Sequence, residues 1–441
     1  MESAKHKNYA LPIAMMFALF AMISFVTGLT NPLGVIIKNQ FGVPNWMSQL
    51  GNAANFIAYA FMGIPAGMLL KRIGYKKTAL AAIAVGIVGV GTQFFSGIVP
   101  ENMAFAIYLT GAFVAGFSMC MLNTVVNPML NTLGGGGKRG NQLIQFGGSL
   151  NSISATIVPV FVGYLMGNVA TATINKANPA LFIAIGIFAL AFIVLYFMQI
   201  PEPAQEIEAQ KESAEGVKDP HSALSFRHFI LGAIAIFLYV GVEVGIPNFV
   251  NLFLSTPVNP TDSAAVPGLG YEAALAGSIC GTYWFLMLIG RLVGGFLGGR
   301  FSSKAMLTFV SSLGLIFVLL AICLPTSIKV DMPVFQSDIS FGLAEVPIGI
   351  MFLILCGLCT SVMWGGIFNL AVEGLGKYTA MASGIFMMLV CGGGILPLIQ
   401  GGVADLFGYM ASYWVVFAAL IYMLFYAVIG CKNVNKDIPV D

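Results

Sequence analysis

Long apolar segments separated by short polar breaks make up most of this chain. Each segment approaches or exceeds the roughly 20 residues that a helix needs to cross the hydrocarbon core of a bilayer. The period-two alternation of a membrane barrel is absent, so the segments are predicted as helices. The predicted spans are 9–37, 46–70, 78–98, 103–130, 142–166 and 179–200, then 228–254, 271–299, 304–324, 346–371, 379–404 and 411–431.

The longest polar stretch divides the spans into two sets of six. It runs over 201–227 and is rich in charge. The predicted organisation is therefore a six-helix bundle over 1–200, a cytoplasmic linker over 201–227 and a second six-helix bundle over 228–441. Composition agrees, because 58% hydrophobic and 9% charged residues are typical of an all-α polytopic membrane protein.

The basic residues predict the orientation. With the N-terminus inside, almost all of the 20 Lys and Arg residues face the cytoplasm. Only Lys38, Lys176 and Lys329 fall outside, and Arg291 lies within a span. This bias predicts a protein of the inner membrane with both termini in the cytoplasm. The net charge of +2 gives no sign of a nucleic-acid partner.

The two halves also repeat short patterns. Gly67, Arg72 and Lys76 recur at the same spacing as Gly295, Arg300 and Lys304, after the second span of each half. The segment 127–134 likewise corresponds to 369–376, after the fourth span of each half. Parallel six-helix repeats are typical of secondary transporters that bind substrate near the membrane midplane.

Motifs along most of the chain carry a family resemblance. They are Asn31-Pro-Leu33, Pro65-Ala-Gly67 with Arg72 to Lys76, Asn127-Pro128, Asn151-Ser152, Tyr239 to Glu243, Gly290-Arg291, Leu375-Gly376 and Gly392 to Gly394. This ordered set resembles the major facilitator superfamily, and within it the fucose/glucose–galactose branch of sugar porters.

The resemblance implies a major facilitator fold and the transport of a monosaccharide, a hexose or deoxyhexose, by alternating access. Two positions depart from the proton-coupled fucose symporter of this branch. Val35 and Asn123 stand where that symporter carries acids. Its proton route therefore cannot be transferred to this chain.

Polar and aromatic side chains at depth are the candidates for binding a sugar, because hydroxyls need hydrogen-bonding partners and a ring face can stack on an aromatic. Helix–helix hydrogen bonding and packing are the alternative roles. Tyr409 and Trp414, at helix ends, are interpreted as interfacial anchors. The candidates are Asn31, Asn123, Asn127, Gln145, Asn151, Glu243, Asn248, Tyr283, Trp284, Trp364 and Asn369.

Two charges lie deep within predicted spans, where ionisable groups are costly and indicate function. Glu243 is about 22 Å from the cytoplasmic end of its helix and Arg291 about 13 Å. Direct pairing is possible, but the depths differ, and Arg291 is assigned to gating or structure. Glu243 is assigned to coupling, by H⁺ or by Na⁺.

The basic residues of the matching loops are further gating candidates. They could bind the C-terminal ends of helices on the cytoplasmic side, and their alternative role is topology. These residues are Arg72, Lys76, Arg300 and Lys304.

Other functions remain open. A multidrug or metabolite exporter and an uncoupled sugar facilitator would share the fold. A membrane enzyme would need a metal or acid/base cluster, but His6, His221 and His228 lie at the terminus and the linker edge. No enzyme activity, cofactor or metal site is expected. The expected partners are the sugar, a co-transported cation and the bilayer, with the chain as a monomer.

Overall fold

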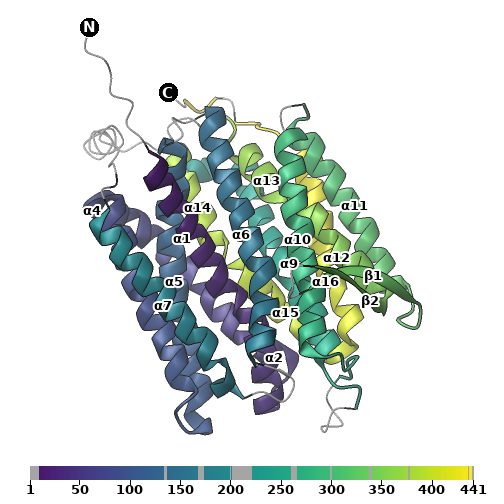
Figure 1. Ribbon diagram of the computed structural model, residues 1–441. Helices are drawn as coiled ribbons and strands as arrows, with labels where there is room; N and C mark the ends of the chain where they lie inside the picture. The colour runs from purple at the N-terminus through teal and green to yellow at the C-terminus, as the bar shows by residue number, and fades with distance from the viewer. Residues whose placement is uncertain are drawn as a thin grey trace.

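The computed structural model is a bundle of long helices in two halves (Figure 1). The chain enters α1 and leaves η4 at one end of this bundle, called here the terminal end; the opposite end is called the far end. The structure describes residues 9–133, 137–166, 173–198, 200, 221–259, 266–297, 300–336, 340–375, 378–435 and 437–439.

The described residues of the N-terminal half form seven α-helices. Two of them, α5 and α6, are 33 and 30 residues long and run the length of the bundle, whereas the 47 residues of α4 form two spans that meet near Gly74. The helices are α1 (Ala10–Gly28), α2 (Thr30–Phe41), α3 (Asn45–Ser48), α4 (Leu50–Ser96), α5 (Glu101–Leu133), α6 (Gly137–Met166) and α7 (Asn178–Phe197).

In the part of the C-terminal half that the structure describes, there are eight α-helices, a final π-helical turn and a two-stranded sheet. The elements are α9 (Arg227–Ser255), α10 (Ala273–Leu297), α11 (Ser303–Cys323), β1 (Lys329–Phe335), β2 (Phe341–Pro347), α12 (Ile348–Thr360), α13 (Met363–Val372), α14 (Thr379–Leu389), α15 (Gly392–Phe407), α16 (Tyr409–Phe425) and η4 (Tyr426–Gly430).

The predicted spans agree with these helices. Among the described residues, 11 stretches are helical, long enough and apolar enough to cross a membrane. The remaining predicted span, 142–166, lies in α6, which runs beside α10 (Figure 1). The first half of α6 carries Gln, Ser and Asn residues, which make it less apolar than the others.

Glycines lie at the break within α4 and next to the joint between α14 and α15. The predicted break over 71–77 is confirmed: α4 comprises two spans, Leu50–Leu70 and Arg72–Ser96, and the chain reverses direction near Gly74, whose φ of 81° suits glycine. The span over 379–404 is instead two helices, α14 and α15, joined at Val390 and Cys391 next to three glycines. Helices interrupted at depth can expose backbone groups only where they line a protein interior.

The sheet was not predicted. β1 and β2 pair antiparallel with Val330 opposite Val346, and buried residues alternate with exposed ones along both strands. The hairpin lies against α10, where the backbone N–H of Phe335 donates to Thr282 Oγ1 at 3.0 Å and its ring stacks on Phe285. The short strands, one of them containing Pro333, gave only a weak period-two pattern.

The two halves meet along two seams. In one, α6 of the N-terminal half packs along α10 of the C-terminal half. In the other, α3 and the first turns of α4 pack against α14 and α15. Glycines permit the close approach in the second seam: a Cβ on Gly394 would lie 2.8 Å from the Cα of Ala53, and one on Gly401 would lie 2.7 Å from the Cα of Trp46.

Candidate functional site

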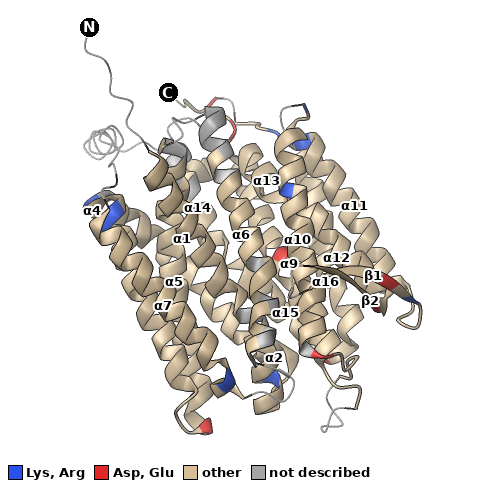
Figure 2. Ribbon diagram, viewed as in Figure 1, with Lys and Arg blue, Asp and Glu red and all other residues tan. Residues whose placement is uncertain are grey.

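Charge is concentrated at the two ends of the bundle, with very little between them (Figure 2). Glu243 on α9 and Arg291 on α10 are the exception. Their side chains are 13% and 12% exposed, and Arg291 Nη2 lies 3.3 Å from Glu243 Oε1. The sequence placed the two residues at different depths, but the long arginine side chain covers a difference of about 9 Å along the helix axes.

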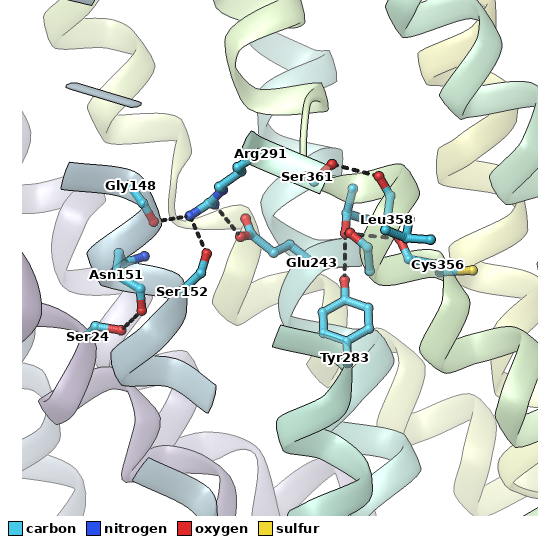
Figure 3. A network of polar contacts seen from close by, with 12 residues as sticks. Ser24, Gly148, Asn151, Ser152, Glu243, Tyr283, Arg291, Cys356, Leu358 and Ser361 are labelled. Atoms are coloured by element: carbon cyan, nitrogen blue, oxygen red, sulfur yellow. Dashed lines mark hydrogen bonds and ion pairs between the residues drawn. The ribbon is translucent and has the colours of Figure 1, made fainter. Parts of the chain in front are cut away.

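Arg291 also reaches across to the other half of the molecule. Its Nη1 donates to the backbone oxygen of Gly148 at 2.6 Å and to Ser152 Oγ at 2.8 Å, both on α6 (Figure 3). One guanidinium therefore joins a carboxylate of the C-terminal half to the backbone of the N-terminal half. Its planar set of donors suits three such acceptors.

Aromatic rings lie beside Glu243. Tyr239, one helical turn earlier on α9, is fully buried, and its hydroxyl has no hydrogen-bond partner among the described residues. The ring of Trp364 lies 6.3 Å from that of Tyr239, centroid to centroid. Trp364 is half-buried and sits just after the joint between α12 and α13.

The other predicted aromatics differ in setting. Tyr283 is completely enclosed, and its hydroxyl is hydrogen-bonded to Thr360 Oγ1 at 3.0 Å (Figure 3). In this arrangement it packs the C-terminal half and offers no surface to a substrate, contrary to expectation. Trp284 is half-buried and meets the Tyr283 ring edge-on at 5.4 Å.

The N-terminal half contributes two half-buried amides from α5. Asn123 Nδ2 donates to Tyr59 Oη at 3.0 Å and to the backbone oxygen of Met119 at 3.1 Å. Asn127 Nδ2 donates to the backbone oxygen of Asn123 at 3.0 Å. The four-residue spacing thus places both amides on one face of α5, as predicted.

The remaining predicted ligands are dispersed. The backbone oxygen of Asn151 accepts from Ser24 Oγ at 2.6 Å, which ties α6 to α1. Asn248 is buried toward the far end, where its Nδ2 donates to Gln49 Oε1 at 3.0 Å. Asn369 is exposed. The side chains of Asn31 and Gln145 lie outside the described part of the structure.

The matching lysines bind helix ends, as the repeat suggested. Lys76 Nζ donates to the backbone oxygens of Tyr196 at 2.8 Å and Met198 at 2.6 Å, at the C-terminus of α7. Lys304 Nζ donates to the backbone oxygen of Val428 at 3.0 Å, in η4. Each lysine therefore holds the last helix of its own half. Arg72 and Arg300 are exposed.

A polar closure at the far end was missed by the sequence. Lys38 was expected outside the membrane as a loop residue and Tyr409 as an interfacial anchor, yet both are buried between the halves. Lys38 Nζ donates to Thr256 Oγ1 at 3.1 Å and to Tyr409 Oη, which in turn donates to Asn45 Oδ1.

Asp405 completes this far-end closure. Its carboxylate accepts the backbone N–H groups of Asn45 at 2.9 Å and Trp46 at 3.1 Å, at the start of α3. These backbone donors have no partner within their own helix, so the acid satisfies them from the opposite half. The partners are more than 200 residues apart in the chain, and no local signal could have joined them.

Comparisons with known proteins identify the family. Residues 15–396 match the family model of the Major Facilitator Superfamily. A glucose/galactose transporter of Brucella abortus is 30% identical over 437 residues, which cover 98% of this chain and 97% of the relative. The L-fucose-proton symporter of Escherichia coli is 23% identical over 97% of this chain and 93% of the relative.

A solved structure shows the same fold. FucP, a transporter of this superfamily crystallised in the outward conformation, superposes with a TM-score of 0.67 at 20% identity, covering 96% of this chain and 100% of that one. The family model covers most of the chain, and the fold agrees with it. The chain is therefore an integral membrane protein that belongs to the Major Facilitator Superfamily.

Proposed function

We propose that the chain carries a monosaccharide across the membrane by alternating access, and that Glu243 couples sugar movement to a proton. One observation carries the proposal: the Glu243–Arg291 pair at depth, with Arg291 also bound to the opposite half. The two named relatives act on small sugars, and they are transporters rather than enzymes.

The arrangement of side chains suits a sugar better than an apolar drug. Asn123 and Asn127 supply amides from one half, and Glu243 and Trp364 supply a carboxylate and an indole from the other. Such a set offers hydrogen bonds to hydroxyls and a flat surface to a ring face. A pocket that tolerates varied apolar cargo would not need these amides at depth.

The ion pair favours a proton over Na⁺ as the coupled ion. A sodium ion bound to Glu243 would sit beside the guanidinium of Arg291 and be repelled by it. A proton instead neutralises the carboxylate and removes its attraction for Arg291. Arg291 would then keep only its partners on α6, so protonation changes the contact between the halves.

The contacts at the far end support an inward-facing state of the cycle. With the termini in the cytoplasm, the closure formed by Lys38, Asn45, Asp405 and Tyr409 seals the outer side, and the site would communicate with the inside. Rocking of the 1–200 bundle against the 228–441 bundle would break this closure and open the site outward.

Uptake into proteoliposomes tests the coupling. Glucose, galactose and L-fucose are offered with an imposed proton gradient, an imposed Na⁺ gradient or neither. We expect accumulation only with the proton gradient, and Glu243→Gln should abolish accumulation while leaving exchange of internal for external sugar. Accumulation driven by Na⁺ would overturn proton coupling. Downhill movement unaffected by either gradient would make the protein a facilitator, with Glu243 a sugar ligand only.

Tryptophan fluorescence tests the stacking surface. The chain has four tryptophans, and Trp364 is the one whose ring lies beside that of Tyr239. A bound sugar should change the emission of the wild-type protein, and Trp364→Phe should remove most of that change and weaken binding about tenfold, as expected for a loss near 1.4 kcal/mol. Trp414→Phe is the matched control, since Trp414 is 48% exposed and packs on Phe417. A full signal in Trp364→Phe would contradict the assignment.

A further inference from the structure

Asn123 has its two amide hydrogens already in use. One is donated to Tyr59 Oη at 3.0 Å and the other to the Met119 backbone oxygen at 3.1 Å. No described residue donates a hydrogen bond to the amide oxygen, Oδ1. This oxygen is also not among the fully buried polar atoms that lack a partner, so it remains accessible. The half-buried Asn123 therefore presents an acceptor to the interior, and no donor.

Tyr59 is held firmly enough to fix this orientation. It lies on α4 with 3% of its surface exposed, and its ring stacks on Phe56 with centroids 6.0 Å apart and planes inclined by 23°. Phe56 is itself confined, because it packs against Gly393 and Gly394 of α15 so closely that a Cβ on Gly393 would lie 2.9 Å from its ring. The hydroxyl that orients Asn123 is thus fixed by packing.

We propose that Tyr59 is a positioning residue for selectivity: by binding the amide nitrogen of Asn123 it makes Asn123 an acceptor-only contact, which requires a hydroxyl donor at one position of the sugar. The inference rests on the proposed monosaccharide transport and adds the direction of one hydrogen bond. A site built to bond a hydroxyl discriminates strongly against an analogue that lacks the proton, because a polar group of the protein is then left unpaired.

Fluorinated sugars test the direction of this bond, since fluorine replaces a hydroxyl in size but cannot donate. Binding of glucose, galactose and L-fucose is measured on the purified protein, followed by the monofluoro analogues of whichever sugar binds best. For the wild-type protein, we expect one ring position at which fluorine lowers affinity about tenfold, the factor for about one lost hydrogen bond.

Tyr59→Phe should relax this requirement. The variant keeps the ring against Phe56 but frees one N–H of Asn123, so the amide can turn and present a donor. We expect the fluorine penalty at that position to fall to threefold or less, and Asn123→Ala should remove it. Tyr108→Phe is the matched control: it also deletes a buried tyrosine hydroxyl, next to Gly51, and should leave the penalty at its wild-type value.

A double-mutant cycle separates positioning from general support of the fold. If Tyr59 acts through Asn123, Tyr59→Phe should change affinity in the wild-type background and have no further effect in the Asn123→Ala background. Equal losses in both backgrounds, or an unchanged fluorine penalty in Tyr59→Phe, would overturn the inference while sugar binding itself still stands. If none of the three sugars binds, the proposed function and this inference fail together.

Discussion

Arg291→Met should reduce sugar uptake to the level of protein-free liposomes and lower the stability of the folded protein markedly. The substitution leaves the Glu243 carboxylate enclosed, with 13% of its side chain exposed and its cationic partner gone. Removing one member of a buried ion pair typically costs about 3–5 kcal/mol, because the remaining charge is uncompensated. Thermal unfolding in detergent and uptake in proteoliposomes measure the two effects.

The companion variants make this prediction specific. The double variant Glu243→Gln, Arg291→Met removes both charges, so it should recover much of the lost stability without recovering coupled uptake. Glu243→Gln alone should be milder than Arg291→Met, since Arg291 keeps Gly148 and Ser152 as acceptors. Lys432→Met, at an exposed position outside the candidate gating residues, is the control and should change little. A stable, active Arg291→Met protein would contradict the role given to the pair.

Gly401→Ala should hold the far end of the bundle apart. The new Cβ would lie 2.7 Å from the Cα and 2.9 Å from the backbone nitrogen of Trp46, which belong to the opposite half and cannot turn aside as a side chain could. The clash exists only while the far end is joined, so the substitution penalises that state alone. A penalty of about 1.4 kcal/mol would shift the population of the two states tenfold.

A labelling experiment measures this shift. Ser48 is buried at the far end with 1% of its surface exposed, and Ser48→Cys with the exposed Cys323 changed to Ser gives a thiol that reports opening. Labelling by a polar maleimide should accelerate about tenfold in Gly401→Ala, and transport should slow. Gly402→Ala, the next residue on α15, has no atom within 4 Å of the added methyl and should label at the original rate. Equal rates in the two variants would contradict a steric role for Gly401.

Sequence reasoning recovered the features that depend on local periodicity and composition. Twenty-residue apolar runs must be helices in lipid, so the spans could be predicted. The cost of a charge at depth singled out Glu243 and Arg291. The matched spacing of Lys76 and Lys304 was visible as a repeat, and both lysines bind helix C-termini in their own halves.

The contacts that were missed are made to the backbone or to distant parts of the chain. The partners of Arg291 on α6 include the carbonyl of Gly148, and a carbonyl leaves no signature in a sequence. Lys38 was assigned to a loop because its partners, Thr256 and Tyr409, are 218 and 371 residues away. Tyr283 and Trp364 could not be distinguished by residue type or by depth in the sequence. Only the packing shows that the Tyr283 hydroxyl already has a hydrogen-bond partner in Thr360.

The β-hairpin constrains how Arg291 can leave its partners. β1 and β2 lead directly into α12, and the hairpin is fastened to α10 by the bond from Phe335 to Thr282 and by the Phe285–Phe335 stack. Because α10 is thereby braced to α12, we expect it to move together with its own bundle. Separation of the Arg291 guanidinium from Gly148 would then accompany movement of the C-terminal half as a body. The distance between α6 and α10 would therefore report how far the transport cycle has advanced.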